Sequence, residues 1–237
     1  VRPDLLHINN GGYPGALSSR LAPIAGRIAG VKACVMVVNN LAVPYNRPAR
    51  ILEWPLDALS KRFVSTYLTA SAAAANRLRR VLRLPEVSVG VIANGIVQQQ
   101  PSASLPAALV DAMAQFEGSI KLGIAAIFET RKGHAVLFEA LRQIAERQNI
   151  NDGKATFALF VQAATSDFAA LQTFIEEMGL SNQVKLLDVS AVDLINAVDI
   201  FVLPSTRDED FPNVNLIAMA LEKPIISTNL AGIPTQV

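Results

Sequence analysis

The sequence predicts an α/β protein with two parallel sheets, and three observations support this fold class. Short apolar runs alternate with stretches of helical period along the whole chain, as repeated βαβ units require. The runs are nearly continuous in Val, Ile, Leu and Phe, which is typical of parallel strands that helices cover on both faces. A polar stretch at 98–104 divides the alternation into two halves. At 237 residues, the chain has room for one large domain or two small ones.

The composition limits the function classes. Hydrophobic residues make up 51% of the sequence and the mean hydropathy is +0.33, which we attribute to buried strands and Ala-rich helices. Lys32, Asp193 and Asp199 interrupt the most apolar windows well before the roughly 18 residues that suggest a membrane span. A net charge of +1 favours neither nucleic acid nor an acidic partner. The single cysteine, Cys34, lies in an apolar run and is expected to be buried, in a reducing compartment.

The first half is predicted to form a domain at residues 1–97. Its strands are expected at 5–8, 34–38, 64–69 and 87–93, and its helices at 16–29, 56–63 and 72–82. Ser71 is placed to cap the helix that begins at residue 72. Segment 45–54 is irregular and contains proline, so we expect a mobile loop there. His7 lies among strand leucines, where we expect a satisfied core residue.

A glycine-rich loop at 9–15 joins the first predicted strand to the first predicted helix. A strand, a glycine loop and a helix together place a backbone cradle at the carboxyl end of a parallel strand. Gly11 and Gly12 would let a ligand approach the backbone beside Tyr13 closely. A plain tight turn remains the alternative. The loop matches neither the dinucleotide nor the P-loop pattern, which argues against a Rossmann oxidoreductase.

The second half is predicted to resume the βαβ pattern in a domain at 119–237, after a linker at 98–118. Its strands are expected at 120–128, 156–161, 184–187 and 200–203, and its helices at 135–147, 167–178 and 192–197. Ser166 is the expected cap of the helix at 167–178. Arg131, Lys132 and Gly133 fall at the first strand–helix junction, where a lysine can reach phosphate oxygens as a compact charge. A surface lysine is the alternative.

The last forty residues carry the most informative pattern. The apolar run at 200–203 ends in Pro204-Ser205, an acidic loop follows, and Pro212 opens a helix with an apolar stripe of Leu216, Met219 and Ala220. Glu209 precedes a helix N-terminus whose N–H groups, around Asn213 and Val214, can hold an anion. A carboxylate for sugar hydroxyls beside an anion site suits a sugar diphosphate.

These residues resemble the donor-site signature of the family 4 glycosyltransferases, which have the GT-B fold. The matching positions are Pro204-Ser205, Glu209-Asp210-Phe211-Pro212-Asn213-Val214 and Ala218-Met219-Ala220, with Lys132-Gly133 as the family's Lys-Gly and Asn94-Gly95-Ile96 as its interdomain turn. The resemblance implies two Rossmann-like parallel-sheet domains, both incomplete in this chain. It also implies a retaining transferase that moves a hexose-type sugar from a nucleotide diphosphate to a hydroxyl acceptor, in glycan or polysaccharide biosynthesis.

The resemblance assigns roles residue by residue. Glu209 would orient the donor sugar, and Lys132 with the helix end would stabilise the leaving diphosphate. The implied donor-binding set is Arg131, Lys132, Gly133, Ser205, Asp210, Phe211, Pro212, Asn213, Val214 and Ile217. The implied acceptor side is Gly11, Gly12, Tyr13 and Asn39. No metal or cofactor is implied, and the donor is expected to be a UDP- or GDP-sugar.

Three positions depart from the family pattern. Ile217 stands where the family has a second glutamate, Ile127 where it has an arginine, and Asn39 near where it often has a histidine. Each lost charged hydrogen bond costs roughly 1.5–3 kcal/mol, or about ten- to a hundredfold in affinity. A catalytically weakened or inactive nucleotide-sugar-binding or scaffolding relative is therefore the alternative function.

The expected location is the cytoplasm, and the expected partners are a nucleotide sugar and a glycan or lipid-linked acceptor. The helix at 72–82 and the residue after it present a basic face of Arg77, Arg79, Arg80 and Arg83. Relatives that build envelope glycans can touch anionic membranes with such a face, so peripheral contact at the inner face of the cell membrane is an open interpretation. A solvated helix surface is the other.

Overall fold

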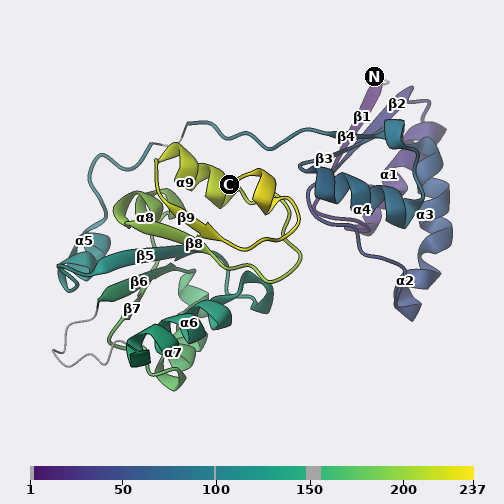
Figure 1. The fold of residues 1–237 in the computed structure, drawn as a ribbon. Coiled ribbons are helices and arrows are strands. Elements are labelled where there is room, and N and C mark those ends of the chain that lie inside the picture. The colour runs from purple at the N-terminus through teal and green to yellow at the C-terminus, as the bar shows by residue number, and fades with distance from the viewer. Residues whose placement is uncertain (1–2, 99, 148–155) are drawn as a thin grey trace. The chain divides into compact units, whose positions relative to one another are not determined.

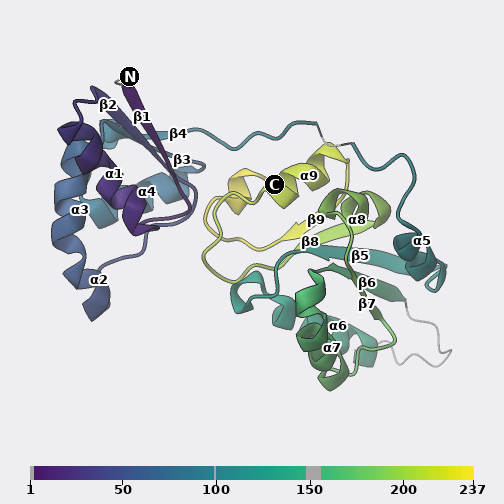
Figure 2. The ribbon, with the colours of Figure 1, turned by 180° about the vertical axis from the view of Figure 1, so that it is seen from behind.

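The computed structural model describes residues 3–98, 100–147 and 156–237, which form two compact units (Figures 1 and 2). The first unit comprises residues 1–94 together with segments 208–211 and 230–236. The second comprises residues 95–207 and 212–229, with Val237. The chain therefore returns twice to the first unit after it has entered the second.

The first unit is built on a four-stranded parallel sheet in the order β1-β2-β3-β4. The strands are β1 (Leu5–Asn10), β2 (Ala33–Val38), β3 (Thr66–Thr69) and β4 (Val89–Val91). The helices are α1 (Leu17–Ile28), α2 (Pro48–Leu52), α3 (Trp54–Ser60) and α4 (Ala72–Leu82). Because the strands are neighbours in chain order and parallel crossovers are right-handed, the connecting helices fall on one face of the sheet.

Burial in the first sheet alternates along the strands, as a single covered face requires. In β2, Cys34, Met36 and Val38 are buried and belong to the unit's apolar core, while the residues between them are half-buried. Helices therefore cover one face of this sheet. His7 shows the consequence, because it lies at an exposed position of β1 and is not the core residue that we expected.

A buried cluster of charges joins the helices of the first unit. The Asp57 carboxylate accepts hydrogen bonds from Arg20 Nη1 at 3.2 Å, from Arg50 Nη1 at 2.6 Å and from the Tyr45 hydroxyl at 2.6 Å. The Arg50 guanidinium also stacks on the Tyr45 ring, 4.2 Å from its centroid. The mobile loop predicted at 45–54 is therefore wrong, since this segment contains α2 and is tied to α1 and α3 by these contacts.

The second unit is built on a five-stranded parallel sheet in the order β7-β6-β5-β8-β9. The strands are β5 (Ile120–Ala125), β6 (Phe157–Gln162), β7 (Val184–Leu187), β8 (Ile200–Leu203) and β9 (Ile225–Ser227). The helices are α5 (Ala107–Ala114), α6 (His134–Arg147), α7 (Phe168–Glu177), α8 (Ala191–Ala197) and α9 (Asn213–Ala220). The strand order reverses between β5 and β8.

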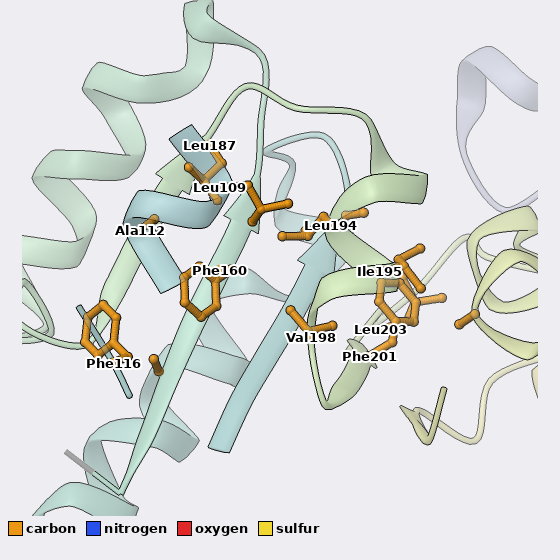
Figure 3. Packing of buried hydrophobic residues seen from close by; sticks show 13 residues of the cluster. Leu109, Ala112, Phe116, Phe160, Leu187, Leu194, Ile195, Val198, Phe201 and Leu203 are labelled. Carbon is orange, nitrogen blue, oxygen red and sulfur yellow. The ribbon is translucent and has the colours of Figure 1, made fainter. Parts of the chain in front are cut away.

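This reversal places helices on both faces of the second sheet and creates two cores. One core packs α5, α8 and α9 against the sheet and includes Phe160, Phe201 and Leu203 (Figure 3). The other core packs α6 and α7 against the opposite face, around Phe138 and Leu159. Five consecutive residues of β6 are buried, which is the pattern predicted for strands covered on both faces.

The α/β fold class is confirmed, and most predicted elements lie within a few residues of their expected bounds. Ser71 caps α4, accepting from the Ala74 N–H at 3.0 Å. Ser166 is not a cap, because it lies within the 3-10 helix at 165–167 and Asp167 holds the N-cap position of α7. The expected linker contains α5.

The predicted apolar stripe of α9 is wrong, since Met219 is exposed and Ala218 faces the core. Within the described ranges, no helix is long and apolar enough to cross a membrane.

Candidate functional site

The reversal of strand order between β5 and β8 marks a place where ligands bind in open α/β sheets. At such a switch point, the chain leaves two neighbouring parallel strands in opposite directions, which opens a crevice outside their carboxyl ends. The loop after β5 carries Lys132 and Gly133, and the loop after β8 carries Ser205. Three residues predicted from sequence to bind the donor therefore lie at one edge of one sheet.

Close packing holds these two loops together. Gly133 follows the 3-10 helix η3 (Thr130–Lys132), has a φ of +76°, and begins the turn into α6. A Cβ atom at Gly133 would lie 1.9 Å from the Pro204 carbonyl oxygen, so no side chain fits there. The Thr206 N–H donates to the Arg131 carbonyl at 2.8 Å, and the Thr206 hydroxyl lies 3.3 Å from the same oxygen. The backbone thus fixes Lys132 beside the end of β8.

The side chains at this edge of the sheet differ in their contacts and exposure. Arg131 Nε donates to a Glu129 carboxylate oxygen at 2.6 Å, so this guanidinium has a partner on its own loop. Lys132 is half-buried. Ile127, at the position of the family's arginine, is 53% exposed on the preceding loop. The structure therefore offers space for a longer side chain at residue 127.

The N-terminus of α9 completes the edge of the second sheet. Pro212 lies at the N-cap position, and no side chain caps the helix, which is the arrangement found where helix ends receive anions. Asn213 is exposed, whereas Val214 and Ile217 are half-buried and pack against the core. Ile217 therefore contributes an apolar contact where the family's glutamate would contribute a carboxylate.

Hydroxyl and amide side chains that sequence reasoning missed position these loops. The Thr228 hydroxyl donates to the Ser205 carbonyl at 2.6 Å, and the Ser227 hydroxyl donates to the Asn215 side-chain oxygen at 3.2 Å. Asn215 is fully buried in α9. The available signal was the pair Ser227-Thr228 directly after a short apolar run, at the carboxyl end of the next parallel strand.

Glu209, Asp210 and Phe211 lie in segment 208–211, which belongs to the first unit. Residues that follow β2, β3 and β4 hold this segment, so it sits at the carboxyl edge of the first sheet. The Asn40 amide donates to the Asp208 carbonyl at 2.8 Å, and the Asn94 amide donates to the Phe211 carbonyl at 3.2 Å.

Asp210 is the most enclosed residue of this segment. It is 1% exposed, and its carboxylate accepts from the Ser71 hydroxyl at 2.5 Å. Burial raises the pKa of this carboxyl, against the opposing effect of its hydrogen bonds from Ser71 and the Gly232 N–H. A Cβ atom at Gly232 would lie 2.5 Å from the Ser71 Cβ and 2.7 Å from the Asp210 carbonyl oxygen. Glu209, beside it, is 8% exposed.

The predicted acceptor-side residues lie at the same edge of the first sheet. Gly11 is exposed, and a Cβ atom at this position would meet no other atom within 4 Å, whereas Gly12 lies against Asn40. The exposed Asn39 amide donates to the Asn9 side-chain oxygen at 2.5 Å and to the Asn10 carbonyl at 3.1 Å. Tyr13 is buried in the core, so its ring faces inward.

No three His, Cys, Asp or Glu side chains in the described part of the chain gather into a group that could hold a metal ion. His134, next to Gly133, is fully buried against the rings of Phe128 and Phe138. Both of its ring nitrogens lack a hydrogen-bond partner, and burial lowers the pKa of His134 to about 4. This residue is therefore a neutral core histidine near the site.

Comparison with protein families finds a match for the second half of the chain. Residues 120–237 match the glycosyl transferases group 1 family. This region contains both loops of the switch point and α9. Comparison with curated proteins finds no match for the chain.

Solved structures match nearly the whole chain. Anabaena Alr3699/HepE in complex with UDP-glucose has 21% identity and a TM-score of 0.75 over 99% of this chain and 62% of its own. A Rickettsia africae glycosyltransferase has 18% identity and a TM-score of 0.72 over 97% of this chain and 58% of its own. A UDP-forming α,α-trehalose-phosphate synthase from Burkholderia vietnamiensis has 12% identity and a TM-score of 0.67, over 99% and 59%.

These matches establish the fold. The two parallel-sheet units match the Rossmann-like domains of the GT-B fold, as the resemblance implied. The chain spans about three fifths of the length of these relatives.

Proposed function

We propose that the chain is part of a retaining family 4 glycosyltransferase, which transfers a hexose from a UDP- or GDP-sugar to a hydroxyl acceptor. The observation that carries the proposal is the switch point between β5 and β8, where Lys132 and the end of β8 are fixed beside each other by the Gly133–Pro204 packing. The family match over residues 120–237 supports it, as do relatives whose structures contain UDP and UDP-glucose.

In this proposal, charge stabilisation of the leaving diphosphate drives the reaction. The Lys132 ammonium binds phosphate oxygens, and the N–H groups at the start of α9, around Asn213 and Val214, bind the same anion. Ser205 and Gly133 bring the backbone close to it, and Arg131 supplies a second positive charge. Glu209 holds the sugar hydroxyls. No metal or cofactor takes part.

The acceptor side of the proposal rests on the first unit. Gly11, Gly12 and Asn39 lie at the carboxyl edge of its sheet, where an acceptor hydroxyl can approach the backbone. The product would be a glycan or polysaccharide made in the cytoplasm. Peripheral membrane contact would use Arg77, Arg80 and Arg83. Arg79 is not part of that face, because its guanidinium donates to the Val89 carbonyl at 2.7 Å and the Glu86 carbonyl at 3.2 Å.

Nucleotide binding tests the proposal directly. UDP or GDP should raise the melting temperature, since a ligand that binds only the folded state stabilises it, and NAD should not. Lys132→Ala should weaken nucleotide binding by about tenfold or more, as expected for a lost charged hydrogen bond. Lys223→Ala is the matched control, because Lys223 precedes β9 at the opposite edge of the sheet. Absence of a shift with every nucleotide would refute the proposal. The anomeric configuration of the product, read by NMR, tests retention.

A second function, a nucleotide-sugar-binding relative without transferase activity, is favoured by Ile127 and Ile217. The Ile127→Arg/Ile217→Glu double variant separates the two. Ile127 is exposed and accepts an arginine readily, whereas a glutamate at 217 replaces a contact with the core. Transfer that rises in the variant supports a weakened enzyme. Nucleotide binding that rises about tenfold without any transfer supports the binding protein.

A further inference from the structure

A cavity of about 430 Å³ lies in the first unit, away from both loops of the switch point. Its described lining comes from the C-terminal half of α4 and from the segment between β2 and α2. The lining residues are Pro44, Tyr45, Arg77, Arg80, Val81 and Arg83. Three of these six carry a guanidinium and none is acidic, so the cavity has a strongly positive wall.

The three guanidinium groups lack a carboxylate partner within the described part of the chain. Arg77 is oriented by a hydrogen bond from its Nε to the Ala42 carbonyl at 2.7 Å, which leaves its two terminal nitrogens for another acceptor. Arg80 Nε makes only a long contact of 3.4 Å with the Asn76 carbonyl. Arg83 follows α4 in a left-handed conformation, with a φ of 53°.

The surroundings do not neutralise this charge. The first unit contains twelve Lys or Arg, all within residues 1–94, against seven Asp or Glu, a net charge of +5. Glu53 and Asp57 pair with buried arginines, Asp4 pairs with Lys32, and Glu209 and Asp210 are buried in segment 208–211. An anion in the cavity therefore meets little competition from the unit's own carboxylates.

A second cavity of about 400 Å³ adjoins the first, since the two share Tyr45, Val81 and Arg83. Its lining combines the side chains of Ile51 and Trp54, which are 53% and 56% exposed, with the charged residues Asp57 and Lys61. Tyr45, between the two cavities, is held by its hydrogen bond to Asp57 and by the Arg50 guanidinium over its ring. Tyr45 is therefore a positioned part of the wall that the two cavities share.

We propose that the arginine cavity binds the phosphate group of a phosphate monoester, with the substituent of that phosphate in the adjoining hollow. Guanidinium groups match phosphate oxygens in a bidentate geometry, and three of them suit a dianion. The ligand is either a soluble phosphate ester or the headgroup of a phosphate-bearing lipid. The proposal does not depend on glycosyl transfer, because none of the donor-site residues lines either cavity.

Calorimetric titration of the chain with glycerol 3-phosphate, and sedimentation with phosphatidylcholine vesicles that contain phosphatidic acid, test the proposal. The Arg80→Gln/Arg83→Gln variant should lose at least tenfold in affinity for the probe that binds. Both side chains are exposed, so the fold should persist. The Arg47→Gln/Arg62→Gln variant removes the same charge from exposed positions outside both cavities and should bind within twofold of the parent.

The pattern of binding identifies the source of the phosphate. Binding of glycerol 3-phosphate indicates a soluble ester, and binding of vesicles alone, weakened by Trp54→Ala, indicates a lipid. Binding of neither probe overturns the proposal, as does an equal loss in the control variant. Loss in Lys132→Ala would assign the phosphate to the donor site and would also overturn it. The Arg80→Gln/Arg83→Gln variant should bind nucleotide as the parent does. This result would separate the test of the arginine cavity from the test of the donor site.

Discussion

The two sheets of this protein differ in one topological respect, from which the other differences follow. In the first sheet, the strands follow each other in chain order, so right-handed crossovers put the helices on one face and a single core results. In the second, the order reverses after β7, which puts helices on both faces, creates two cores and opens a crevice at the reversal. One reversal thus supplies both the additional apolar core and the candidate donor site.

The first prediction concerns the buried charge cluster of the first unit, which has one apolar core where the second unit has two. The cluster around Asp57 joins α1, α3 and Tyr45, and Asp57→Ala leaves the buried Arg20 and Arg50 guanidinium groups with the partly exposed Glu53 as their remaining carboxylate partner. The loss should be about 3–5 kcal/mol of the free energy of unfolding. The single tryptophan, Trp54, reports unfolding of this unit by fluorescence in urea. A loss below about 1 kcal/mol would show that packing, not charge, holds these helices.

The second prediction compares one residue type on the two sheets. Leu159 of β6 is fully buried, so Leu159→Ala should cost about 2–5 kcal/mol. Leu68 of β3 is only half-buried, on the less covered face, and Leu68→Ala should cost less than half as much. Urea denaturation followed by hydrogen exchange of each unit measures both. Equal losses would contradict the assignment of one covered face to the first sheet.

The third prediction uses His134, which is buried beside the site in the second unit. Its pKa is lowered from 6.5 to about 4 by burial and by the Lys132 charge, against the opposing effect of Asp167. Above pH 6.5, neither the folded nor the unfolded state binds the proton. As the pH falls from 6.5 to 4, only the unfolded state gains it, so stability is lost, by about 2 kcal/mol between pH 7 and pH 5. His134→Leu should flatten this part of the pH profile, and an unchanged profile would contradict the prediction.

The smallest expected effect compares two helix caps. Ser190 caps α8 in the second unit, with a hydroxyl that accepts from the Asp193 N–H at 3.0 Å, and Ser190→Ala should cost about 1 kcal/mol. Ser71 caps α4 in the same way, and both hydroxyls also donate to a buried carboxylate, Ser190 to Asp193 at 2.8 Å and Ser71 to Asp210. Asp193 keeps two further hydrogen bonds from Ser102, whereas Asp210 keeps one from the Gly232 N–H, so Ser71→Ala should cost about 1 kcal/mol more. Thermal unfolding of the two variants measures the difference, and equal shifts would show that the contact with Asp210 contributes no more than the contact with Asp193.

The elements were largely predictable because their signals are local. Apolar runs and caps placed β7, β8 and α4 at their observed bounds. The failures involve information that a local pattern does not carry. His7 is exposed because of sheet topology, and segment 45–54 is held in place by the Asp57 carboxylate of α3. The stripe of α9 was misassigned because that helix is apolar on most of its surface, so periodicity does not select a face.

The sequence predicted the loops of the candidate site, but not the contacts that hold those loops in place. Lys132, Gly133 and Ser205 were identified from sequence, and the structure places them at one sheet edge. The Gly133–Pro204 contact and the hydrogen bonds from Thr206 and Thr228 depend on the pairing of β5 with β8, which no local signal specifies. The roles in donor binding remain predictions.

The return of segments 208–211 and 230–236 to the first unit has an evolutionary consequence. The two units are not separable modules, since residues 1–94 taken alone would lose the partners of Asn40, Ser71 and Asn94. A recombination event that exchanged the first unit for another would have to preserve these three polar side chains, together with the glycine at 232. Because the two units are interleaved in the chain, we expect recombination to exchange them together.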